Sequence, residues 1–232
     1  MKNHLLLIII FMFTYSHAQV KSGEVIYGVT VTENKESNLE KMMLSMNANY
    51  YSITKEFEFK LLFNKSKASF SEVQKLYSDE QAVKFGQLKV GVDGSFLIKN
   101  DSVYNEGASV GIGEYIKRKL LSKNWTLLTE TKLIDNYVCY KATAEHVVIY
   151  KDKTFKHPIT AWYCPQIPFS FGPLGYGGLP GLILELQTKD AVFGVKKIQL
   201  SDTTIEIKDL KKFKILEEEE LNALIRRKNG EE

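Results

Sequence analysis

Apolar and polar side chains alternate in many short stretches of this chain, which is the pattern of strands with one buried face. Residues 25–31 show it well, because β-branched side chains dominate there. Strands are predicted at 25–31, 57–63, 68–73, 96–99, 101–104, 125–128, 131–134, 137–145, 147–150, 159–163, 182–187, 191–200 and 203–208. Turn-forming residues separate most of them at intervals of roughly 8–12 residues, which indicates a meandering antiparallel sheet.

Apolar residues return at helical spacing in two places. Between Leu39 and Phe57 they recur every three or four residues, which predicts a helix that ends near Thr54. Residues 216–227 predict a short C-terminal helix, with acidic side chains at its start and basic ones at its end, as the helix dipole favours. Residues 74–94 carry no clear pattern.

These elements predict a mainly β protein, at the margin of the α+β class. We expect a single curled antiparallel sheet, a sandwich or a partial barrel, with one longer helix in the N-terminal half and a short one at the end. A hydrophobic fraction of 44% can support a sizeable core. Because the sequence has no internal repeat and no linker, residues 19–232 are expected to form one domain.

The first 18 residues have the pattern of a secretory signal peptide. Lys2 precedes an unbroken apolar run from Leu5 to Phe13, and small residues at Ser16 and Ala18 suit cleavage after Ala18. Nine apolar residues are too few for a membrane anchor, which needs about 20. The chain is therefore predicted to be exported, to the periplasm or the medium, and not to span a membrane after cleavage.

The net charge and the cysteines bear on the partners of the protein and on its disulfide content. The net charge of +3 is close to balance, which argues against nucleic acid as a partner. Both cysteines, Cys139 and Cys164, lie in the part predicted to be exported. A pair in an oxidising compartment predicts one disulfide, and the alternative is two buried free thiols.

Candidate catalytic chemistry is sparse. His146 and His157 are the histidines beyond the signal peptide, and their spacing matches no metal-binding pattern, so no metal or cofactor is predicted. Glu185 stands out as a carboxylate in an otherwise apolar strand. Either the leucines around it face the core while Glu185 faces solvent or a cavity, or it is a functional acid or base.

The densest cluster of glycine and proline lies at residues 172–186 and contains the letters GLPGLI at 178–183. This motif, with the segments 125–142 and 161–173, resembles the GLPGLI family of exported proteins, found mainly in Bacteroidetes and without an established biochemical role. The resemblance implies export and one β-rich domain, but it brings no catalytic residues.

Prolines at 165, 168 and 173 keep residues 164–177 out of a regular strand, so these residues are predicted to form an extended apolar loop. The loop either caps an open end of the sheet or lines a groove. The candidate binding or structural residues are Trp162, Tyr163, Phe171, Gly172, Pro173, Tyr176, Gly178, Leu179, Pro180, Gly181 and Glu185.

Two functions are compatible with these features. The first is a non-enzymatic binding or accessory protein of the cell envelope, whose partner is an outer-membrane receptor, a peptide or an apolar ligand. The second is an envelope hydrolase without a recognisable motif, with Glu185 as its acid or base. The GLPGLI motif itself is either functional or purely structural.

Overall fold

Twelve strands form one continuous, unclosed sheet in the computed structural model, which describes residues 20–33, 37–150 and 153–228. The strands are β1 (Ser22–Val31), β2 (Glu58–Asn64), β3 (Lys67–Glu72), β4 (Phe96–Lys99), β5 (Ser102–Ser109), β6 (Gly113–Leu120), β7 (Thr126–Ile134), β8 (Tyr137–Tyr150), β9 (Lys153–Cys164), β10 (Leu182–Gln187), β11 (Ala191–Ser201) and β12 (Lys214–Glu217). Their spatial order is β12-β6-β5-β4-β3-β2-β1-β11-β10-β9-β8-β7. Every neighbouring pair is antiparallel except β12 with β6, so the predicted mainly β class is confirmed.

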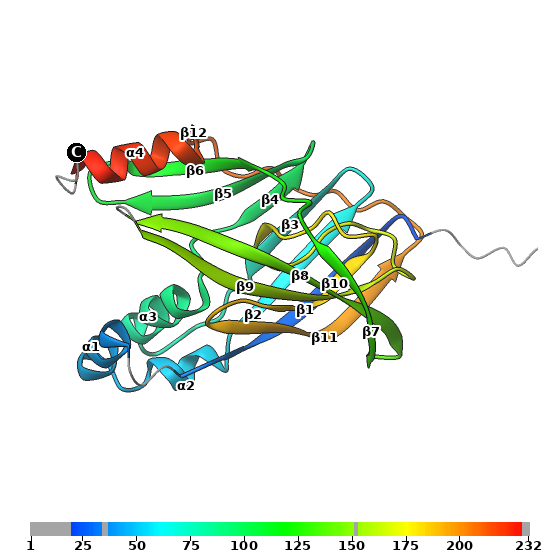
Figure 1. Ribbon diagram of the computed structural model, residues 1–232, viewed down its shortest axis with the longest axis horizontal. Helices are drawn as coiled ribbons and strands as arrows, with labels where there is room; N and C mark the ends of the chain where they lie inside the picture. Colours follow the sequence, from blue (N-terminus) through cyan, green and yellow to red (C-terminus); the bar gives the residue numbers. More distant parts are fainter. Residues whose placement is uncertain (1–19, 34–36, 151–152, 229–232) are drawn as a thin grey trace, which may run out of the picture.

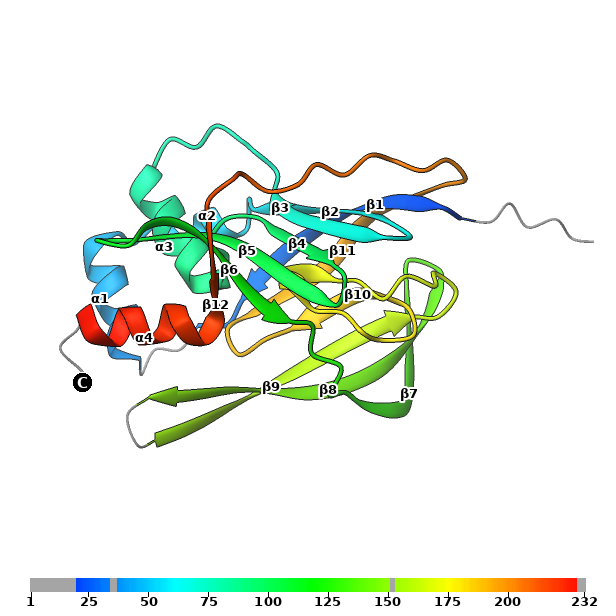
Figure 2. The ribbon, with the colours of Figure 1, turned by 90° about the horizontal axis from the view of Figure 1, so that it is seen from above.

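The sheet curls, so that strands far apart in its order lie across from one another (Figures 1 and 2). We call the β5–β6 hairpin and the β8–β9 hairpin the two arms. Three helices, α1 (Asn38–Met46), α2 (Tyr50–Thr54) and α3 (Glu80–Val90), gather at one end of the sheet (Figure 1). The C-terminal helix α4 (Glu218–Lys228) packs along β6 beside β12.

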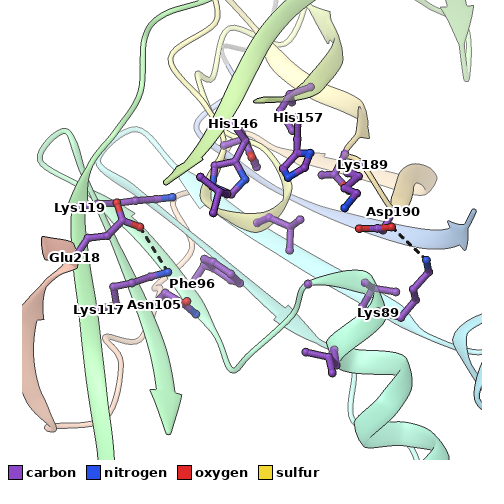
Figure 3. Close-up of a pocket in the computed structure, with 18 residues that line it drawn as sticks. Lys89, Phe96, Asn105, Lys117, Lys119, His146, His157, Lys189, Asp190 and Glu218 are labelled. Atoms are coloured by element: carbon purple, nitrogen blue, oxygen red, sulfur yellow. Dashed lines mark hydrogen bonds and ion pairs between the residues drawn. The ribbon is translucent and has the colours of Figure 1, made fainter. Parts of the chain in front are cut away.

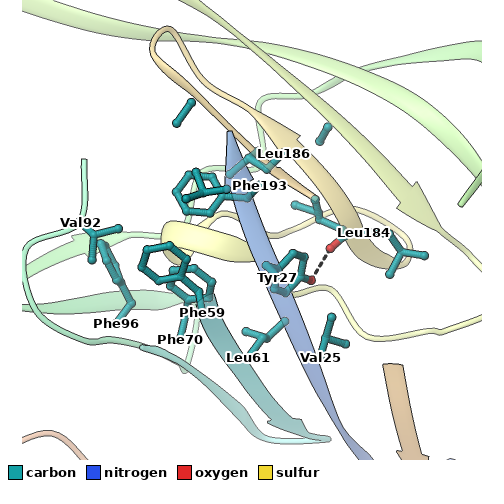
Figure 4. Close-up of a cluster of buried hydrophobic side chains, with 14 of the residues drawn as sticks. Val25, Tyr27, Phe59, Leu61, Phe70, Val92, Phe96, Leu184, Leu186 and Phe193 are labelled. Carbon is teal, nitrogen blue, oxygen red and sulfur yellow. Dashed lines mark hydrogen bonds between the residues drawn. The ribbon is translucent and has the colours of Figure 1, made fainter. Parts of the chain in front are cut away.

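Aromatic side chains fill the inside of the curl (Figure 4). Tyr27 on β1 lies opposite Phe59 on β2, and Phe59 stacks on Phe70 with 5.4 Å between ring centroids. Phe193 on β11 meets Phe59 edge to face at 5.3 Å. These rings are almost fully buried, and the Tyr27 hydroxyl donates a 2.6 Å hydrogen bond to the carbonyl oxygen of Ile183, so the polar atom in this core is satisfied.

Residues 165–181, between β9 and β10, form the signature loop, in which exposed residues such as Pro165, Pro168 and Pro180 alternate with residues that point into the interior. Ile167 and Leu179 are fully or almost fully buried in it. Its backbone bonds to β10, since Leu182 and Ile183 donate 3.0 Å hydrogen bonds to the carbonyl oxygens of Ile167 and Phe171. The loop therefore fills the curl of the sheet as part of the core.

Two glycines of the GLPGLI motif occupy positions that disfavour any larger residue. A Cβ atom on Gly181 would lie 2.2 Å from the carbonyl oxygen of Cys164, which is backbone and has no room to move. Gly178 has a φ of 77°, in the left-handed region that favours glycine. The motif thus lets two backbone segments touch.

The structure corrects several predicted elements. The single helix predicted to end near Thr54 is two helices, because Asn47 leaves the helical conformation and its side chain bonds instead to Asp79 and to the backbone of Asn49. Helix α3 lies in the segment without a clear pattern, capped by the Asp79 carboxylate. Residues 203–208 form no strand, and β12 follows later, paired to β6. The strands predicted at 137–145 and 147–150 are one strand, β8, and those predicted at 125–128 and 131–134 are one strand, β7. Strand β6 was not predicted.

We expect Gly181→Ala to lower the free energy of unfolding by more than about 2 kcal/mol, since the added methyl group would push on the Cys164 backbone. Gly194→Ala is the control, because a Cβ there meets nothing within 4 Å. It should change stability by less than about 0.5 kcal/mol. Urea unfolding followed by tryptophan fluorescence measures both, and equal stability of the two variants would contradict the assignment.

Candidate ligand-binding pocket

A cavity of about 390 Å³, the inter-arm pocket, lies between the two arms of the sheet. Strands β5 and β6 line one side, and β8 and β9 line the other. The end of α3, the start of α4 and the turn between β10 and β11 complete its wall (Figure 3). Leu174 and Tyr176 bring the signature loop into the lining, so the core-filling loop also shapes the pocket.

Two histidines face each other on the second arm. His146 on β8 and His157 on β9 are direct partners in the antiparallel register, with 6.5 Å between ring centroids. His157 shares its face of β9 with the buried Ile159, two residues along, so both rings extend the inner face of the hairpin toward the pocket. Figure 3 shows both side chains directed into the cavity.

Two lysines of β6 approach from the opposite arm. Lys117 and Lys119 are two residues apart and therefore share a face of the strand. Lys117 pairs with Glu218 at 3.7 Å, whereas the side chain of Lys119, also half-buried, makes no hydrogen bond or ion pair with any described residue. Burial lowers the pKa of Lys119; Glu218 opposes this shift and Lys117 adds to it.

The third side of the pocket carries a buried ion pair. Lys89 on α3 binds the Glu40 carboxylate and lies 3.2 Å from Asp190 in the turn after β10. Burial disfavours the Lys89 charge, but the two carboxylates outweigh this and keep its pKa above the ordinary value. Lys189, next to Asp190, is exposed at the rim.

The pocket is net positive. Four lysines line it against two carboxylates, and both carboxylates are held by lysines. Burial lowers the pKa of His146, and the nearby charges of Lys119 and His157 lower it further. These surroundings therefore disfavour additional positive charge at His146.

Of the candidate residues predicted from the sequence, Tyr176 lines this pocket. Burial raises the pKa of its hydroxyl. Phe171 and Gly178 line a different cavity, near Lys123. The remaining loop candidates all belong to the signature loop. They are Gly172, Pro173, Leu179, Pro180 and Gly181.

Trp162 and Glu185 form a separate cluster. The Glu185 carboxylate accepts a 2.7 Å hydrogen bond from Lys132, whose Nζ lies 4.5 Å from the centroid of the Trp162 ring. The Glu185 side chain is 27% exposed and is not part of the inter-arm pocket. Tyr163, next to Trp162 and so on the other face of β9, packs against Tyr140 with ring centroids 6.1 Å apart.

The sequence analysis did not recognise the histidine pair or the lysines. The histidine pair does have a signal in the sequence. His146 lies four residues before Tyr150, and His157 lies four residues after Lys153. Because Tyr150 and Lys153 pair at the end of the hairpin, this equal spacing places the two histidines opposite each other. Lys119 had no local signal, since only the curl of the sheet brings β6 across from β8 and β9.

Cys139 and Cys164 are fully buried neighbours on β8 and β9. They lie one step beyond the paired Tyr140 and Tyr163, so they face each other across the two strands. Both are free thiols in the structure, so it does not contain the predicted disulfide. A hydrogen bond between the thiols lowers the pKa of Cys164 to about 7 and raises that of Cys139.

Within the described part of the chain, no three histidine, cysteine or carboxylate side chains converge as metal ligands. None of the described helices is long and apolar enough to cross a bilayer. The predicted signal peptide lies outside the described residues.

Comparison with known proteins gives a family of unknown function and several solved structures. A family described as a protein of unknown function, Porph_ging, matches residues 150–185, which include the whole GLPGLI motif. No curated protein matches the chain. Two structures of PNGF-II, in space groups C2 and P21, align over 88% of this chain at 15% and 13% identity, each with a TM-score of 0.49. The alignment spans about a third of the PNGF-II chain, 32% and 33%.

Substitution of two glutamates compares the contribution of a partly exposed ion pair to the free energy of unfolding with that of a buried one. Glu185→Gln should change the free energy of unfolding by less than about 1 kcal/mol, because its pair with Lys132 is partly exposed. Glu40→Gln should lower it by more than about 2 kcal/mol, because the buried Lys89 then keeps only the more exposed Asp190. Urea unfolding at pH 7 measures both, and similar losses would contradict this assignment.

Proposed function

We propose that the protein is an exported, non-enzymatic binding or accessory protein of the cell envelope and a member of the GLPGLI family. The signal-peptide pattern of residues 1–18 supports export to the periplasm or the medium. The match of the Porph_ging family to residues 150–185, which contain the GLPGLI motif, supports the proposed membership.

The observation that carries the binding function is the inter-arm pocket. Its volume of about 390 Å³ falls in the range of small-molecule sites, which combine apolar walls with a few convergent polar groups. Phe96, Ile159 and Leu174 supply apolar surface, and the lysines and histidines supply the polar groups. The occupant is a small ligand or the side chain of a peptide, and an outer-membrane receptor is the proposed partner that delivers or receives it.

The alternative, an envelope hydrolase that uses Glu185, has less support. The Glu185 carboxylate is bound to Lys132 in a cluster separate from the pocket. Glu185 lines a different cavity of about 410 Å³, together with Lys55 and Lys196, and it is the ion pair with Lys132 that disfavours a role as general acid or base there.

We expect Val148→Trp to abolish ligand binding, because Val148 lines the pocket and an indole ring would fill it. Val147→Trp is the matched control, since adjacent residues of a strand point to opposite faces and Val147 does not line the pocket. The protein, isolated from the envelope fraction of its host, is analysed by native mass spectrometry for bound molecules. A ligand is expected in the wild type and in Val147→Trp, and absence from all three, or presence in all three, would contradict the proposal.

Export also predicts the state of the two cysteines. Directly opposed residues on antiparallel strands have Cα atoms about 4.5–5.5 Å apart, which is compatible with a disulfide. In the compartment to which the protein is exported, an oxidant that carries a disulfide would accept two electrons and two protons from Cys139 and Cys164. The two cysteines would then form a disulfide, and the oxidant would become a dithiol.

The exported protein, denatured without reductant, should therefore have no thiol that iodoacetamide alkylates, and two after reduction. The measurement is the mass of the alkylated protein. Cytosolic expression without residues 1–18 is the control, and it should give two alkylated thiols before reduction. Two alkylated thiols in the exported protein would contradict the predicted disulfide.

A further inference from the structure

Among the described residues that line the inter-arm pocket, Lys119 is a half-buried lysine without a direct counter-charge, whereas the unpaired Lys189 is exposed to solvent at the rim. Charges that are removed from water are normally paired, because the loss of hydration is otherwise uncompensated. Lys89 follows this rule with Glu40 and Asp190, and Lys117 follows it with Glu218. Lys119 is half-buried and has no direct partner among the described residues.

Lys119 extends toward His146 in the pocket, and His157 lies directly across from His146 (Figure 3). Each imidazole can donate a hydrogen bond when neutral and carries a positive charge when protonated. One ammonium group and two imidazoles therefore converge from opposite arms of the sheet. Such a group of donors matches an anionic oxygen group.

Apolar surface continues from this cationic group. Phe96 on β4 and Leu174 in the signature loop line the same cavity. A free inorganic anion would leave these side chains without a contact, whereas a ligand with an apolar body would cover them.

We infer that the ligand of the inter-arm pocket is an organic anion whose carboxylate or phosphate group binds Lys119, His146 and His157 and whose apolar body packs on Phe96 and Leu174. This inference rests on the proposed binding function. It adds the chemical class of the ligand.

A pair of fluorescent dyes tests the charge requirement. 8-Anilinonaphthalene-1-sulfonate carries an anionic group on an aromatic body, and N-phenyl-1-naphthylamine has the same body without the charge. With the full chain, we expect Lys119→Gln to weaken sulfonate-dye binding about tenfold, the size of one charge-assisted hydrogen bond, and to change neutral-dye binding less than about twofold.

The matched control is Lys197→Gln, which removes the same charge from an exposed site outside the pocket. It should change the affinity for either dye less than about twofold. Equal effects of the Lys119 and Lys197 substitutions on the sulfonate dye would overturn the inference, because binding would then respond only to overall charge.

The histidines predict a pH dependence with a definite sign. The sulfonate stays ionised between pH 8 and pH 5.5, while protonation of an imidazole beside it adds positive charge, so sulfonate-dye affinity should rise as the pH falls. The bound anion should raise the pKa of His146, which burial and the neighbouring positive charges hold down. The charged or titratable groups that face the pair are Lys89, Lys117, Lys119, Tyr176, Lys189, Asp190 and Glu218.

The double variant His146→Gln/His157→Gln should remove most of this pH dependence and keep neutral-dye binding. A wild-type affinity that does not change with pH, or a pH dependence that survives the double substitution, would overturn the role of the histidines. Competition of octanoate and octyl phosphate against the sulfonate dye then identifies the anionic group as carboxylate or phosphate.

Failure of this inference differs from failure of the proposed function. If both dyes bind equally, Val148→Trp blocks both and Lys119→Gln affects neither, the pocket binds ligands without a charge requirement and only the anion inference is overturned. If Val148→Trp affects neither dye, the pocket is not a binding site and the proposed function is overturned with it.

Discussion

The contact between the backbone at Gly181 and the carbonyl group of Cys164 is the constraint on which the rest of the structure depends. It lets the signature loop leave β9, cross the interior and return as β10 in direct pairing with β9. A side chain at this position would separate the two segments. Ile167, Phe169 and Leu179 of this loop belong to the same buried cluster as the aromatic core, so the glycine motif fixes a segment that packs directly on that core.

The same loop joins the core to the inter-arm pocket. Ile167 and Leu179 are buried, whereas Leu174 and Tyr176 of the same segment reach the cavity. A structural role and a binding role are therefore compatible within this one segment. Its glycines and apolar anchors hold the loop in place, and its middle presents side chains to the proposed ligand.

The contrast between Lys89 and Lys119 explains why the pocket is proposed to bind an anion. Both lysines line the same cavity. Lys89 is surrounded by carboxylates from α1 and from the turn after β10, which stabilise its charge. Lys119 has only the more distant influence of Glu218, which already pairs with Lys117. An anionic ligand would supply the missing counter-charge.

The sequence by itself determined the β-rich class, most strand positions, the C-terminal helix and the unusual backbone of the GLPGLI segment. These follow from local periodicity and from the conformational limits of glycine and proline. It did not reveal α3, whose amphipathic pattern is weak, or the break at Asn47, which depends on a bond to Asp79. Only the tertiary structure brought Lys119 to the two histidines, because contacts between distant strands depend on the curl of the whole sheet, which no local pattern encodes.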